Sequence, residues 1–156
     1  MPKRDPINET DEEARQLARR LLSEVRHGSI AVTDPESGAP HVTRVAILGI
    51  DGAPHVLISD LSTHTKALAA DPLCSVLIGE PGTKGDPLTH PRMTVVARAV
   101  AADKAALREV WLAAIPKAQL YYDFADFRMM RLAPLEVHLN GGFGKAFRLT
   151  PDDLRG

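Results

Sequence analysis

The motif ISDLSTHTKAL gathers hydroxyl, imidazole and ammonium groups where an expected strand passes into the first turn of an expected helix. A helix start has free backbone N–H groups and a partial positive charge, so such side chains suit a phosphate or another anion. Serine and threonine are also ordinary helix caps, and lysine is an ordinary surface residue, so this alternative stays open. The donors and the cation are Ser62, Thr63, His64, Thr65 and Lys66.

Two further strands carry cations that could serve the same site. In HVTRVAIL, Arg44 shares a side with apolar residues, and a guanidinium there needs an anionic or carbonyl partner if it is buried. In RMTVVARAV, Arg92 and Thr94 lie on one side of the expected strand. The alternatives are a salt bridge or a solvated strand end for Arg44, and a mixed polar edge strand for the second pair.

Motifs for hydrolysis or metal binding are absent from the sequence. GGFGK lacks the spacing of a dinucleotide fingerprint, and the six histidines form no zinc-binding pattern. No G-x-S-x-G nucleophile motif is present. The residues therefore favour a cofactor that brings its own chemistry, with the protein supplying a pocket and electrostatics.

Composition favours one globular domain over residues 1–156, with residues 1–9 loosely held. The formal net charge of −1 provides no basic field for nucleic acid or an anionic membrane. The single Cys74 excludes an intrachain disulfide and fits a reducing compartment. With no apolar run of membrane-spanning length, the sequence favours a cytoplasmic protein.

Apolar periodicity predicts three helices separated by short strands. The first helix is expected over 11–27, capped by Thr10 and stopped by Gly28. The second begins near Ser62, and the third runs from a cap at Asp103 to Pro116. Strands are expected at 29–33, 41–50, 54–59, 73–79, 93–101, 127–140 and 145–149, with a bulge or edge at Pro134. This pattern predicts a mainly β (α+β) fold, a barrel of six to seven mostly antiparallel strands with three flanking helices.

The order of RVAIL, ISDLSTHTKAL, DPL, PRMTVVARA and YYDFADFRMMRLAPLEVHLNGGFGKA resembles the pyridoxamine 5′-phosphate oxidase-like, FMN-binding split-barrel family, in particular its haem-utilisation branch. The resemblance spans about residues 10 to 150. It implies a homodimer of split barrels with FMN in clefts between the subunits.

The resemblance also assigns roles to particular residues. Arg44 and Val45 lie on the strand that lines the flavin, and Ser59 lies near the ring or ribityl chain. Ser62 is a possible cap of the phosphate-binding turn, and Arg92 and Thr94 complete the cleft. The phosphate turn itself is His64, Thr65 and Lys66, and the segment that closes over the site contains Phe143 and Lys145.

These features indicate an FMN-dependent oxidoreductase whose substrate is an unknown small molecule or a haem-related compound. The alternatives are a non-enzymatic flavin- or haem-binding protein for storage, sensing or transfer, and an interaction domain with a decayed phosphate site. Haem-degrading members of the branch carry an added C-terminal segment, which is not seen before Gly156. The C-terminal substrate motif of the pyridoxamine phosphate oxidases is also not seen, so the sequence favours neither of those two activities.

Overall fold

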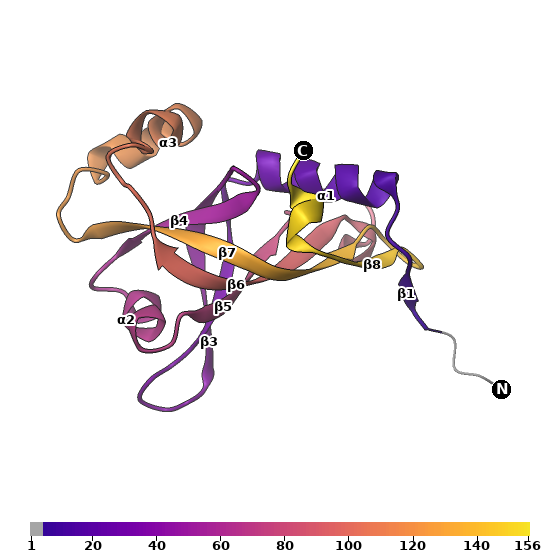
Figure 1. Cartoon of the computed structure of the whole chain (residues 1–156), viewed down its shortest axis with the longest axis horizontal. Coiled ribbons are helices and arrows are strands. Elements are labelled where there is room, and N and C mark those ends of the chain that lie inside the picture. Colours follow the sequence, from indigo (N-terminus) through magenta and orange to yellow (C-terminus); the bar gives the residue numbers. More distant parts are fainter. Residues whose placement is uncertain (1–4) are drawn as a thin grey trace.

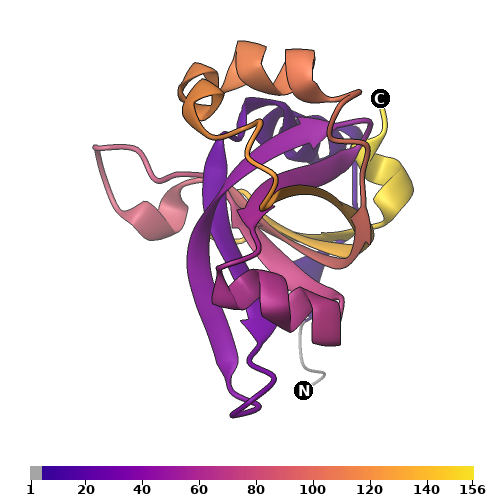
Figure 2. The same cartoon turned by 90° about the vertical axis from the view of Figure 1, so that its left-hand side faces the viewer.

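Six antiparallel strands close into a small barrel in the computed structural model, which describes residues 5–156 (Figures 1 and 2). The barrel strands are β2 (His27–Thr33), β3 (Pro40–Ile50), β4 (Ala53–Ser59), β5 (Leu73–Ile78), β6 (Arg92–Ala101) and β7 (Phe127–Asn140). The short strands β1 (Ile7–Asn8) and β8 (Ala146–Leu149) extend the sheet beyond β7. The helices are α1 (Glu12–Glu24), α2 (Thr63–Ala70) and α3 (Arg108–Ala114), with 3₁₀ turns η1 (Pro87–Thr89), η2 (Pro116–Leu120) and η3 (Pro151–Leu154). The predicted fold class is confirmed.

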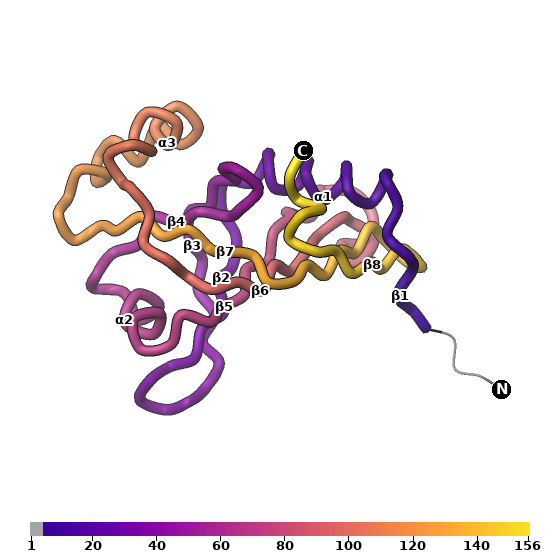
Figure 3. The backbone as a smooth tube through the Cα atoms, in the orientation of Figure 1, coloured from indigo at the N-terminus to yellow at the C-terminus, as the bar shows by residue number. Residues whose placement is uncertain are grey.

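The long strand β7 closes the barrel. Its first residues pair with β4, and β6 pairs along most of its length, so the circular order is β7-β4-β3-β2-β5-β6. The two strands run side by side across the molecule (Figure 3). A register shift between Val96 and Ala97 lies opposite Pro134, which confirms the predicted bulge.

Side chains alternate between the barrel interior and its outer surface, and each side has its own core. The interior core is made of the inward residues of all six strands together with the buried face of α1. A second cluster lies on the outer surface of β3, β4 and β7, where α3 and η2 cover it around Trp111 and Tyr122. The outer surface of β2, β5 and β6 has no such cover in the described chain.

The first helix is shorter than predicted and begins at a different cap. The Asp11 carboxylate accepts a hydrogen bond from the Ala14 N–H at 2.8 Å, while the Thr10 hydroxyl bonds to the Arg148 carbonyl instead. The expectation of a Thr10 cap was therefore wrong, because aspartate one position later lies at the helix start and caps at least as well.

The helix stops at Glu24, and Gly28 does not end it. Gly28 lies inside β2, where a Cβ atom would come 2.5 Å from the Leu77 carbonyl oxygen on β5. The glycine therefore permits the close approach of two strands.

The predicted third helix is also too long. Asp103 caps a turn by accepting from the Ala106 N–H at 3.0 Å, but α3 begins only at Arg108. The expectation of loosely held residues 1–9 also needs correction, because Ile7 and Asn8 form β1, parallel to β8. Residues 1–4 lie outside the described residues.

Candidate functional site

The turn from β4 into α2 is held by hydrogen bonds to Ser59. The Ser59 carbonyl accepts from the Thr65 hydroxyl at 2.5 Å and from the Ser62 N–H at 3.0 Å. Its hydroxyl donates to the Asp126 carboxylate at 3.0 Å, and the Asp126 carbonyl accepts from the Asp60 N–H. The segment before β7, which contains Asp126, thus holds the turn in place.

The start of α2 keeps backbone donors free. Ser62 is the N-cap residue, yet its side chain makes no capping hydrogen bond. Thr65 and Lys66 bond to the Ser62 carbonyl, whereas within residues 5–156 the N–H groups of Thr63 and His64 have no hydrogen-bond partner. Free N–H groups at a helix start are suited to an anion.

His64 points away from the other predicted phosphate residues. Its ring is buried, and Nδ1 lies 3.0 Å from the Thr43 hydroxyl on β3. Burial, with a smaller effect from His41, lowers the pKa of His64 below its ordinary value. The imidazole is therefore neutral at pH 7 and adds no positive charge to the turn.

Thr65 and Lys66 border a cavity of about 420 Å³ that His64 does not line. Its floor is apolar and includes Ile58 and Met130. Arg128 also lines this cavity and forms an ion pair with the Asp60 carboxylate, which leaves Lys66 as an exposed cation with no ion-pair partner among the described residues. Arg128 carried no readable signal in the sequence, because its neighbourhood FRMMR reads equally well as an ordinary strand.

Arg44 and Thr94 lie on one surface but not at one point. Strand pairing aligns Arg44 with Ser29, Ser29 with Leu77, and Leu77 with Thr94, so all four side chains share the outer surface of the barrel. Three strand spacings separate Arg44 from Thr94, about 14 Å. Val45 points the opposite way, into the barrel core, where it is only 6% exposed.

Arg92 and Phe143 meet at a second cavity, of about 360 Å³, at the β1 and β8 end of the molecule. The Arg92 guanidinium donates to the Leu88 carbonyl at 2.7 Å, and Phe143 is 74% exposed in the turn between β7 and β8. Lys145, exposed in the same turn, does not line this cavity but a neighbouring one beside α1. Figure 1 shows this end opposite the end that carries α2.

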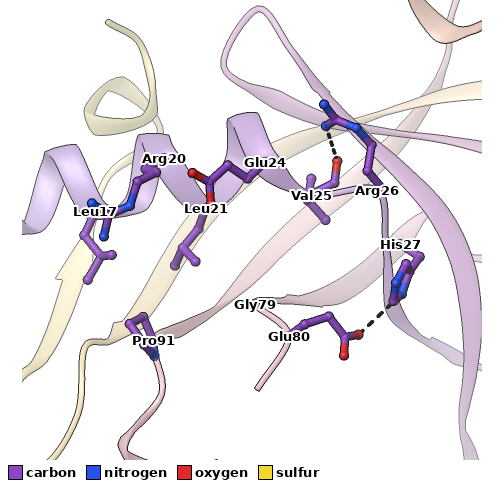
Figure 4. Close-up of a pocket in the computed structure, with 10 residues that line it drawn as sticks. All are labelled: Leu17, Arg20, Leu21, Glu24, Val25, Arg26, His27, Gly79, Glu80 and Pro91. Carbon is purple, nitrogen blue, oxygen red and sulfur yellow. Dashed lines mark hydrogen bonds and ion pairs between the residues drawn. The ribbon is translucent and has the colours of Figure 1, made fainter. Parts of the chain in front are cut away.

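A third cavity, of about 450 Å³, runs along α1 and holds none of the predicted site residues (Figure 4). Leu17 and Leu21 face Pro91 across it, and His27 and Glu80 form an ion pair at 3.3 Å on its rim. Among the described residues no group of three or more histidine, cysteine or acidic side chains could hold a metal ion, and no helix is long and apolar enough to cross a membrane.

The chain is similar to several proteins of known structure. No family model matches it. A solved structure with 46% sequence identity superposes with a TM-score of 0.89, covering 94% of this chain and 98% of the other. The heme binding protein from Mycobacterium smegmatis is 30% identical, with a TM-score of 0.84, over 93% of this chain and 61% of that one. A Listeria innocua protein described as a putative pyridoxamine 5′-phosphate oxidase shares the fold at 13% identity, over 82% of this chain and 98% of that one, with a TM-score of 0.66.

One curated sequence relative agrees with these structures. The non-canonical heme oxygenase HOZ of Arabidopsis thaliana, a chloroplastic protein, is 41% identical over 102 residues, which is 62% of this chain and 30% of that protein. The chain belongs to a haem-related family of split-barrel proteins. Its fold is that of the pyridoxamine 5′-phosphate oxidase-like proteins. It spans under a third of the length of this curated family member.

The structure does not bring all the predicted site residues together within one chain. The predicted site residues divide between the α2 turn, the outer barrel surface and the β8 end. Among the described residues of one chain, Ser59, Ser62, Thr65 and Lys66 form one continuous group in the α2 turn. His64, in the same turn, bonds to Thr43 on β3.

Proposed function

We propose that the protein binds FMN and acts as an oxidoreductase, with the phosphate held at the start of α2. The observation that carries the proposal is a helix start whose N-cap side chain makes no capping bond. Among residues 5–156 the Thr63 and His64 N–H groups and the neighbouring Lys66 cation have no partner. A phosphate dianion would accept from both N–H groups and from the ammonium group, which are charge-assisted hydrogen bonds.

The adjoining cavity fits the rest of the cofactor. Its volume lies in the range of small-molecule sites, and its apolar floor of Ile58, Leu68 and Met130 suits a flat aromatic ring. FMN supplies two-electron transfer chemistry when bound. The described residues then orient it, and Lys66 provides net positive charge on the rim, where Asp60 compensates the charge of Arg128.

A homodimer would bring together predicted site residues that lie apart within one chain. Arg44 and Thr94 lie on the outer surface and line neither of the first two cavities, and Arg92 and Phe143 lie at the far end from α2. We propose that two copies pack their outer surfaces together, so that the β8 end of one copy reaches the α2 turn of the other. Val45 then serves only as core packing beneath Arg44.

The substrate we propose is haem-related. The support is the 41% identity to a heme oxygenase and the 30% identity to a heme binding protein. A second candidate follows from the latter relative, namely a protein that binds haem or flavin without turnover.

The test is a fluorescence titration of FMN into protein freed of cofactor. Lys66→Glu replaces the unpaired cation with an anion, so we expect FMN affinity to fall by about 100-fold or more. Lys117→Glu, on η2 and away from the turn, is the matched control and should bind as the wild type does.

Unchanged affinity in Lys66→Glu would refute the site. A parallel titration with haemin separates the second candidate. Tight haemin binding by a protein that takes up no FMN would overturn the flavin proposal.

A further inference from the structure

The segment between β5 and β6 projects from the barrel (Figure 2). The His90 side chain holds this loop together through two hydrogen bonds. Nδ1 of His90 accepts a hydrogen bond from the Gly82 N–H at 2.8 Å. Nε2 lies 2.7 Å from the Lys84 carbonyl oxygen. The His90 side chain therefore bonds to two points of the loop, Gly82 and Lys84, from the position directly before Pro91 and β6.

These partners define the protonation state of the ring. A backbone N–H can only donate, so Nδ1 must be unprotonated, and a carbonyl can only accept, so Nε2 must carry the proton. The imidazole that satisfies both contacts is neutral. A second proton would sit on Nδ1, facing the Gly82 N–H, and would replace that hydrogen bond with a repulsive contact.

The fastened loop forms one wall of the second cavity. The Arg92 guanidinium donates to the Leu88 and His90 carbonyls at 2.7 and 3.3 Å, and the Leu88 side chain lines the same cavity. The loop also supports the opposite wall, because a Cβ on Gly142 would lie 3.2 Å from the Thr89 carbonyl oxygen. The position of Arg92 thus depends on the loop backbone.

We propose that His90 is a positioning residue that holds Arg92 at the cofactor cleft only while its imidazole is neutral, so that acid releases the loop and weakens cofactor binding. The part that concerns the cofactor rests on the proposed function. The charged residues of the loop are Glu80, Lys84 and Asp86, and Arg92 of β6 bonds to the His90 carbonyl. Glu80 pairs with His27, and among the described residues no acidic side chain forms an ion pair with the His90 imidazole.

The loop itself is tested by NMR without any cofactor. Between pH 8 and pH 5, where histidines usually gain a proton, the hydrogen-exchange protection of the Gly82 amide, corrected for its intrinsic pH dependence, should fall about fivefold. The fall should follow the titration of the His90 ring nitrogens. His90→Asn keeps an acceptor for Gly82 but does not titrate, so its protection should stay constant.

His41→Asn, on β3 and away from the loop, should behave as the wild type. Gly82 protection that does not change with pH, or that changes equally in His90→Asn, would overturn the proposal.

The second readout is the ratio of FMN dissociation constants of wild type and His90→Asn, which cancels the titration of the phosphate group itself. The ratio should rise about fivefold from pH 8 to pH 5. A flat ratio, with Gly82 still following His90, would overturn the positioning role. Absence of FMN binding at every pH would overturn the proposed function separately, since the NMR result does not depend on it.

Discussion

At the scale of residues, His55 and His64 share a response to pH that follows from their burial. Burial lowers the pKa of both imidazoles below the ordinary value of 6.5. The Nδ1–H of His55 donates to the Ala53 carbonyl at 3.1 Å, so the neutral form is satisfied in place. Because the folded state binds the proton less readily than the unfolded state, each histidine contributes stability above pH 6.5 that is lost as pH falls.

We predict that the melting temperature falls between pH 7 and pH 5, and that His55→Gln reduces this fall. Glutamine can keep a hydrogen bond to Ala53 but does not titrate. Thermal unfolding of both proteins at both pH values measures the effect. An equal fall in wild type and His55→Gln would show that His55 does not contribute.

The sequence predicts which residues form the α2 turn better than it predicts where the side chains of the site residues point. Ser59, Thr65 and Lys66 come together because they are close in sequence and share one turn. Val45 was assigned to the flavin-lining strand with Arg44, but strand alternation turns it inward, into the barrel core. Arg128 could not be predicted, because its contact with Asp60 depends on the pairing of β4 with β7.

At the scale of elements, α2 differs from α1 in how it begins. Asp11 caps α1, whereas Ser62 leaves the first N–H groups of α2 unbonded. A helix that forgoes a cap sacrifices stability, on the order of 1 kcal/mol, and keeps its donors for a ligand. The start of α2 therefore has the form of a binding turn.

We predict that Ser62→Asp raises stability and weakens FMN binding together. An aspartate would cap the free N–H groups and add a favourable charge at the helix start, which raises the melting temperature by about 2–4 °C. The same carboxylate would repel the phosphate. Thermal unfolding and FMN titration measure the two effects.

Ser62→Ala is the control and should leave stability nearly unchanged, because the serine side chain makes no capping bond. If Ser62→Asp stabilised the protein without weakening FMN binding, the phosphate would not lie at this turn.

Element prediction from sequence succeeds where the pattern is local. Alternation placed β3, β4, β6 and β7 within one residue of their observed ends. The third helix was overestimated, because Asp103 to Leu107 form turns that pack beside Tyr122, whose hydroxyl bonds to the Lys104 carbonyl. Closure of the barrel by β6 and β7 is a long-range pairing, which the composition favours but local signals do not specify.

At the scale of the whole molecule, the outer surface of β3, β2 and β5 exposes apolar side chains beside Arg44. Val42 is 62% exposed and Leu77 is 47% exposed. Exposed apolar side chains on an uncovered sheet surface favour association with another protein surface. The proposed homodimer would cover this surface.

We predict that Leu77→Arg yields a folded monomer with weakened FMN binding, because a charge is introduced at the centre of the proposed interface. Light scattering during gel filtration gives the mass, and circular dichroism confirms the fold. Leu120→Arg, at a position 80% exposed on η2, is the control and should remain dimeric. A wild-type protein that is monomeric at all concentrations would contradict the interface.

The most direct test of the account is the visible spectrum of the protein purified from cells, together with the mass of the cofactor that it releases on denaturation. The account predicts a flavin spectrum and the mass of FMN, in a ratio of one FMN per chain, and loss of both in Lys66→Glu. A colourless protein that stays colourless after incubation with FMN would contradict the central claim, as would a haem spectrum with no flavin released.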